Sequence, residues 1–124
     1  MALVTLESKW GPGDIFLLEF KERKLARTTN LLGKAHDLLL IDYRKAKAEP
    51  YNEYHDFIFE TEDNPICRLD GNQRVRFNGF ATTDPKHVSD GRAWEGRVVA
   101  VWDIAQRKFT SQKVTRIFAG FRKD

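Results

Sequence analysis

The fold prediction starts from Arg97-Val98-Val99-Ala100-Val101-Trp102-Asp103, a stretch dominated by β-branched and apolar residues. Such composition is typical of a β-strand. After a short polar connection from Ala105 to Lys108, apolar and polar residues alternate from Phe109 to Phe118. Two strand-like runs joined by a short polar connection predict an antiparallel hairpin. We therefore expect a β-hairpin in the last third of the chain.

The rest of the chain is expected to be mainly β. Asp70-Gly71-Asn72 is a tight-turn sequence between Ile66–Leu69 and Arg74–Phe77, which predicts a second hairpin. Two further strands are predicted over Asp14–Lys21 and Tyr54–Glu60. The segment Thr82–Gly96 is rich in turn-forming residues, and we expect it to be an exposed loop.

The stretch between residues 31 and 49 is the open question. Its leucines almost fit a helical stripe, whereas Gly33 weakens a helix. A strand over Asp37–Tyr43 is the alternative, and Pro50 would end either element. The sequence thus predicts mainly β structure, possibly with one helix between residues 31 and 49.

A 60-residue shift aligns several apolar runs of the chain with one another. Leu38–Ile41 falls on Val98–Val101, which suggests an internal repeat of residues 14–64 and 74–124. The alternative is a chance alignment of apolar runs. In either case we expect a single compact domain over residues 1–124, since this length can bury a substantial core.

Composition points to an ordered protein in a reducing compartment. Hydrophobic residues make up 41% and charged residues 31% of the chain, which is typical of globular domains. Cys67 is the only cysteine, so neither an internal disulfide nor a zinc pair is expected. The sequence lacks both a signal-peptide pattern at Met1 and an apolar run of about 18 residues. We expect a cytoplasmic protein that does not enter membranes.

Charge is distributed in blocks, although the net charge is only +3. Residues 21–47 hold eight basic and three acidic side chains, residues 48–65 hold six acidic and no basic ones, and residues 105–124 hold six basic and one acidic. If the basic blocks share one face after folding, that face would attract a polyanion. Ordinary solvated surface charge is the alternative.

Candidate binding residues combine arginines and lysines with an aromatic side chain. Arginine binds phosphates in a bidentate manner, and an exposed tryptophan can stack on an unpaired base. Trp94 stands in the predicted polar loop and is therefore expected to be exposed. The nucleic-acid-binding residues predicted in this way are Arg92, Trp94, Arg97, Arg107, Lys108, Lys113 and Arg116.

Signals for catalysis or cofactor binding are weak. His36, His55 and His87 lack metal-ligand spacing, and we expect neither a metal nor a cofactor. Glu19-Phe20-Lys21 resembles the Glu-Xaa-Lys strand of restriction-endonuclease-like nucleases. Asp14, the nearest preceding aspartate, would point to the opposite face of the same strand. Binding is therefore favoured over catalysis.

The terminal hairpin resembles that of WYL-type modules, which are small SH3-like or Sm-like β-barrels found in bacterial regulators and phage proteins. Lys113, Val114, Arg116 and Ile117 follow the family pattern of the returning strand. Thr115 replaces the usual acid, and the Trp-Tyr-Leu motif is absent. The resemblance covers only about 20 residues of the chain. It implies one or two SH3-like small barrels with arginines on a nucleic-acid-sensing face.

The sequence therefore favours a nucleic-acid-binding accessory or regulatory protein that uses a basic face to bind DNA or RNA. The first alternative is a protein-interaction module, such as a small phage or mobile-element factor that binds a host protein through its acidic block, Glu49–Asp63. The second alternative is a metal-dependent nuclease.

Overall fold

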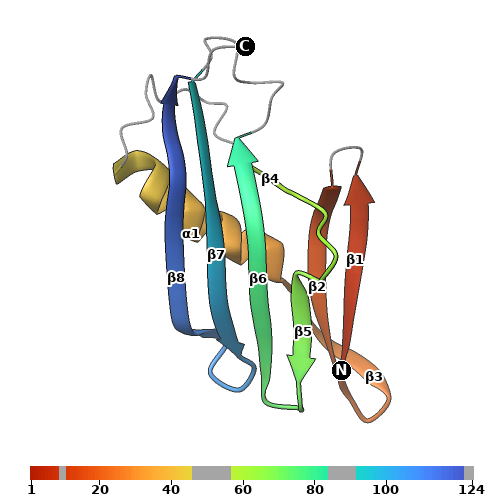
Figure 1. The fold of residues 1–124 in the computed structure, drawn as a ribbon. Helices are drawn as coiled ribbons and strands as arrows, with labels where there is room; N and C mark the ends of the chain where they lie inside the picture. Colours follow the sequence, from red (N-terminus) through yellow and green to blue (C-terminus); the bar gives the residue numbers. More distant parts are fainter. Residues whose placement is uncertain (9–10, 46–56, 84–91, 122–124) are drawn as a thin grey trace.

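The computed structural model describes residues 1–8, 11–45, 57–83 and 92–121. These ranges form eight strands and one helix, which confirms the prediction of a mainly β fold with one helix (Figure 1). In chain order the elements are β1 (Ala2–Ser8), β2 (Gly11–Lys21), β3 (Lys24–Asn30), α1 (Leu31–Lys45), β4 (Phe57–Phe59), β5 (Cys67–Asp70), β6 (Arg74–Thr83), β7 (Arg92–Asp103) and β8 (Lys108–Phe121).

The strands form two antiparallel sheets. One sheet has the order β1-β2-β3, and the other has the order β4-β6-β7-β8 with β5 paired to β6. Both predicted hairpins are confirmed: β5 pairs with β6 across a turn in which Gly71 has a φ of 63°, and β7 pairs with β8. The described strands form open sheets, and no closed barrel is present among them.

Helix α1 begins directly after β3. Asn30 caps the helix, because its Oδ1 accepts a hydrogen bond from the Gly33 backbone N–H at 3.2 Å. Leu31, Ala35 and Leu39 recur at helical spacing and are fully or almost fully buried. A strand over residues 37–43 would send alternate leucines to opposite faces. The strand alternative for this stretch is therefore wrong.

One core joins the helix to both sheets. Figure 1 shows α1 running from the three-stranded sheet across the back of the five-stranded sheet. Its buried leucines belong to the same cluster as Leu17 of β2, Phe77 of β6, and Trp94 and Val98 of β7. Side chains that alternate along each strand supply this core from one face of each sheet.

One expectation for the second half needs correction. Residues 92–96 do not form an exposed loop, because they open β7, and Glu95 pairs with Thr82 of β6; residues 84–91 lie outside the described ranges. Trp94 and Gly96 point inwards between polar neighbours, so the alternation is that of a strand. The two halves of the suggested repeat also differ in structure, since residues 38–41 are helical and residues 98–101 are extended.

Candidate functional site

Trp94 is a core residue and not an exposed stacking platform. Its side chain is 0% exposed, and its Nε1–H donates a 2.8 Å hydrogen bond to Oδ2 of Asp42 in α1. The expectation of exposure is wrong because polar neighbours in sequence do not determine which face of a strand a side chain occupies. Trp94 therefore cannot stack on a base without leaving the core.

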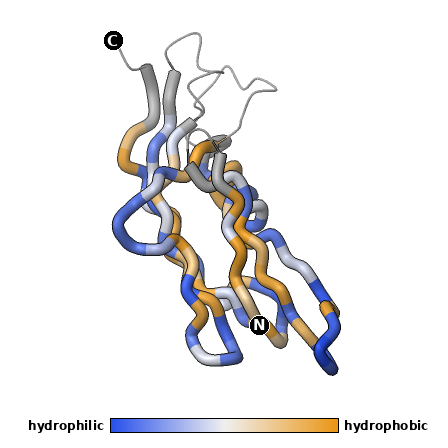
Figure 2. Tube along the Cα trace, turned by 90° about the vertical axis from the view of Figure 1, so that its right-hand side faces the viewer, coloured by the Kyte–Doolittle hydropathy of each residue, from blue (hydrophilic) through white to orange (hydrophobic). Residues whose placement is uncertain are grey.

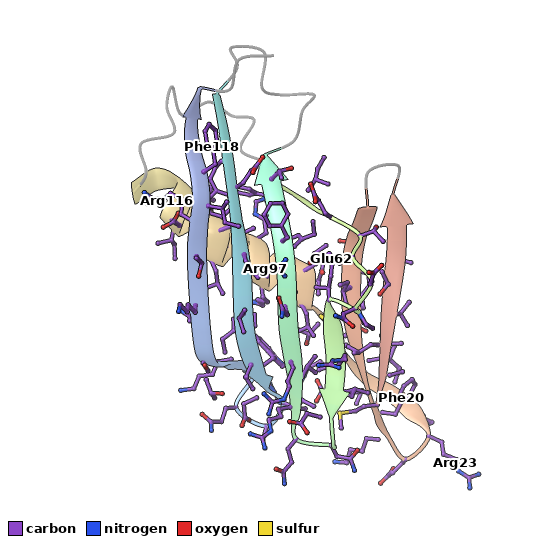
Figure 3. The ribbon with its side chains drawn as sticks, viewed as in Figure 1. Phe20, Arg23, Glu62, Arg97, Arg116 and Phe118 are labelled. Carbon is purple, nitrogen blue, oxygen red and sulfur yellow. The ribbon has the colours of Figure 1, made fainter. Side chains whose placement is uncertain are left out.

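Arg116 also binds Asp42. Its Nε lies 3.0 Å from Oδ2 and its Nη2 lies 3.2 Å from Oδ1 of that carboxylate, on the side of the sheet that α1 covers (Figure 3). Lys113 is exposed and pairs with Val99, an outward-facing residue, whereas Arg116 pairs with the buried Gly96. Lys113 and Arg116 thus lie on opposite faces of β8, and they do not form one phosphate site.

Arg97 lies on the outer face of the five-stranded sheet and is held by a carboxylate. Its Nη1 and Nη2 donate to the two oxygens of Glu62 at 3.1 and 2.8 Å, and Nη1 also donates to Asn78 Oδ1 at 2.7 Å. The hydrogen bonds between the two charged side chains lower the pKa of Glu62 and raise the pKa of Arg97. Glu62 belongs to the acidic block, so the positive charge of Arg97 is locally compensated.

The remaining predicted cations are spread along the hairpin. Arg107 and Lys108 stand at the turn between β7 and β8, where the Arg107 N–H donates to the Asp103 carbonyl at 2.8 Å. Six strand residues, about 20 Å, separate Asp103 from Arg97. Arg92 opens β7, and its side chain lies outside the described set. The six predicted residues whose side chains the structure describes therefore do not lie on one continuous surface.

A different set of cations, which the sequence analysis did not predict as binding residues, lies on β5 and β6. Arg68 of β5 and Arg76 of β6 lie directly opposite each other, and both are exposed. Together with Asn78 and Arg97 they line a surface hollow of about 300 Å³ beside the loop that contains Glu62. The alternation Arg74-Val75-Arg76-Phe77 indicates an outward arginine face, but the opposition of Arg68 to Arg76 follows only from the register.

The central strand of the three-stranded sheet, β2, is apolar on both faces from Ile15 to Leu18. Ile15 and Leu17 of β2 are buried in the core, whereas the alternate residues Phe16 and Leu18 are only half-buried and lie outside the core cluster. Val4 of β1 pairs with Phe16 on this outer side. Strands apolar on both faces are typical of sheets that are covered on both sides.

Exposed apolar side chains extend this outer side to the end of the β2–β3 hairpin. Phe20 pairs with Leu25 across the hairpin, and these side chains are 51% and 55% exposed. Leu6 of β1 is 50% exposed. Figure 2 shows that the strands next to the N-terminus are coloured hydrophobic along much of their length. We call the set Val4, Leu6, Phe16, Leu18, Phe20 and Leu25 the apolar outer face.

Cations border one end of the apolar outer face. Lys21, Arg23 and Lys24 are exposed at the β2–β3 turn, and Figure 3 shows Arg23 projecting from the same end of the sheet as Phe20. Glu22 and Arg23 form this turn with φ values of 54° and 65°, the left-handed region that glycine or asparagine adopts more readily.

The nuclease-like residues are not assembled into a metal site. Asp14 accepts a 2.8 Å hydrogen bond from Asn30 Nδ2, whereas Glu19 lies 3.7 Å from Arg27 on the other face of β2. Within the described ranges, no three His, Cys, Asp or Glu side chains lie close enough to hold a metal ion together.

Comparison of the chain with protein-family models, with curated proteins and with solved structures gives no match. In the part of the chain that the structure describes, no helix has the length and apolar character needed to cross a membrane.

Proposed function

We propose that this chain is a protein-interaction module whose apolar outer face binds an amphipathic, acidic α-helix of a partner protein. The observation that carries the proposal is β2, whose buried Ile15 and Leu17 alternate with the outward-facing Phe16, Leu18 and half-exposed Phe20. A contiguous exposed apolar patch on a soluble domain typically marks an interaction site. The surface differs from the acidic block that the sequence analysis suggested for a protein partner.

The dimensions of the face favour a helix as the occupant. Three strands span about 10 Å between their outer axes, and seven residues extend about 24 Å. This area matches one helix of about 16 residues, whose diameter with side chains is about 10–12 Å. It is smaller than the roughly 800 Å² per partner of a standard interface between two folded proteins. Helix α1 already covers the inner face of the same strand β2.

Charge complementarity specifies the acidic character of the partner. The turn that follows Phe20 and precedes Leu25 carries the exposed cations Lys21, Arg23 and Lys24 against one exposed carboxylate, Glu22. Carboxylates on the polar flank of the helix would therefore meet mostly cations at this end of the sheet. A helix C-terminus would be favoured there as well, because its dipole is negative. A basic helix would be repelled by the same residues.

Nucleic-acid binding, which the sequence favoured, ranks second. Carboxylates compensate Arg97 and Arg116, and Trp94 is buried. The observation that still favours a phosphate-containing ligand is the opposed pair Arg68 and Arg76. That the terminal hairpin belongs to a WYL-type module stays a prediction.

The test is a fluorescence-anisotropy titration with two labelled synthetic peptides. Both peptides place leucine on one helical face. On the other face the acidic peptide carries glutamate and the basic peptide carries lysine. We expect the intact chain to bind the acidic peptide and discriminate against the basic one. Phe20→Asp should weaken binding roughly 10- to 100-fold, since burial of a phenylalanine is worth about 1.5–3 kcal/mol.

Ile117→Asp is the matched control, because Ile117 is 59% exposed on β8 of the other sheet. It should bind the acidic peptide as the intact chain does. Equal binding of both peptides, or no effect of Phe20→Asp, would refute the proposal. Analytical ultracentrifugation tests a second copy as occupant: a dimer that Phe20→Asp dissociates would overturn the assignment of this face to a helix.

A further inference from the structure

We propose that Arg68 and Arg76, with Asn78 beside them, form a binding site for a phosphate group on the outer face of the five-stranded sheet. The site is separate from the apolar outer face, which belongs to the other sheet. It does not depend on the protein partner proposed above.

The register of β5 and β6 places two like charges in direct opposition. Arg68 pairs with Arg76 in an antiparallel ladder, and both side chains are exposed. Like charges directly opposite each other destabilise a sheet. An anion that binds between the two guanidinium groups would remove this repulsion.

The carboxylates of the chain leave this pair undercompensated. Asp70 Oδ2 accepts a 3.0 Å hydrogen bond from Nε of Arg76 and forms an ion pair with Nε of Arg74 at 3.1 Å, so one carboxylate serves two arginines. Arg68 makes no hydrogen bond or ion pair with any residue in the described ranges. Arg76 is bound through Nε, and its terminal nitrogens make no hydrogen bond to a described residue.

The surroundings provide a hollow and a neutral donor. Arg68, Arg76, Asn78 and Arg97 line the space of about 300 Å³, together with the loop from Glu62 to Ile66. Asn78 accepts from Arg97 through Oδ1, which leaves its Nδ2–H₂ as a donor.

The charge around the hollow is positive. Glu62 and Arg97 compensate each other, and Arg76 shares Asp70 with Arg74, which leaves Arg68 with Asp63 as the only further carboxylate in the lining of the hollow as the structure describes it. Three arginines therefore line the hollow against two carboxylates.

A phosphate group fits this arrangement chemically. Its oxygens accept bidentate hydrogen bonds from guanidinium groups, and these charge-assisted bonds are stronger than bonds between neutral groups. The group could belong to a nucleic-acid backbone or to a small phosphate compound. Both sources share the same recognition chemistry, and the arms of the experiment separate them.

The first measurement is the thermal unfolding midpoint of the chain with increasing inorganic phosphate or inorganic triphosphate, against chloride at equal ionic strength. We expect both phosphate ligands to raise the midpoint more than chloride does. Arg68→Gln should abolish this increase. Without phosphate, the same variant should unfold at an equal or higher temperature, because the opposed charges are gone. A purely structural role of Arg68 predicts the reverse, namely a lower midpoint without phosphate.

Arg23→Gln is the matched control, since it removes an exposed arginine from the turn of the other sheet. It should retain the phosphate response. A second arm titrates labelled single- and double-stranded oligonucleotides at two salt concentrations. Salt-sensitive binding that Arg68→Gln weakens about tenfold would assign the phosphate to nucleic acid. Stabilisation by triphosphate without any binding of oligonucleotides would assign the phosphate group to a small compound. No response in either arm, or an equal response in Arg68→Gln, would overturn the site.

Discussion

At Gly96 the core leaves no room for a larger side chain. A Cβ at this residue would collide with the Trp94 ring and would lie 2.8 Å from the Thr115 carbonyl oxygen. We expect Gly96→Ala to lower the free energy of unfolding by about 2–3 kcal/mol, because overpacking displaces the ring or the neighbouring strand. Urea denaturation measures the change.

Gly33 provides the comparison, since a Cβ there would meet only Asn30, at 3.5 Å. Gly33→Ala should therefore stabilise the protein by about 0.5–1 kcal/mol, the difference in helix propensity. If Gly96→Ala were as well tolerated as Gly33→Ala, the packing described around Trp94 would be incorrect.

Cys67 is the second residue with a measurable consequence. It is 9% exposed, and burial raises the pKa of its thiol to about 12. Because the thiolate is the reactive form, alkylation of the folded protein by iodoacetamide at pH 8 should be at least about a hundredfold slower than in denaturant. Mass spectrometry after timed quenching measures both rates. Rapid modification of the folded chain would contradict the burial of this side chain.

The burial and the contact partners of single residues were the properties that the sequence predicted least well. The identity of Trp94 suggested a base-stacking role, but a polar sequence context is compatible with either face of a strand. Its hydrogen bond to Asp42 joins residues 52 positions apart, and no local pattern contains that information. The opposition of Arg68 to Arg76 likewise required the strand register.

At the scale of elements, Asp42 links α1 to the β7–β8 hairpin through Trp94 and Arg116. Asp42→Leu should lower the free energy of unfolding by about 1–3 kcal/mol, because the buried indole N–H loses its acceptor. Asp42→Asn retains an acceptor oxygen and should cost less. Chemical denaturation compares the two variants, and equal losses would contradict the role given to the Trp94 hydrogen bond.

The elements themselves were largely predictable from local chemistry. The Asp70-Gly71-Asn72 turn and the alternation after Phe109 predicted both hairpins of the second sheet correctly. The segment between residues 31 and 49 stayed ambiguous because a run of leucines suits a buried strand as well as a helix. The Asn30 cap and the single buried face of α1 resolve that ambiguity in three dimensions.

At the scale of the whole molecule, acid sensitivity should depend on the pair Glu62 and Arg97. The pKa of Glu62 is lowered in the folded state, so this carboxylate contributes stability above its unfolded pKa of about 4.5 and loses it as the pH falls through the folded value. The melting temperature of the intact chain should therefore fall more steeply below pH 4.5 than that of Glu62→Gln. Parallel curves for the two proteins would show that the pair contributes nothing.

The apolar outer face also affects how much of the protein is retained while this face is uncovered. In the isolated chain, Phe20, Leu25 and Leu6 each expose about half of their surface to solvent. Exposed apolar patches of this kind favour aggregation when nothing covers them. If the proposed partner helix covers this face, copies made in excess of that partner should be lost first, so the cellular abundance of the chain should follow the supply of the partner.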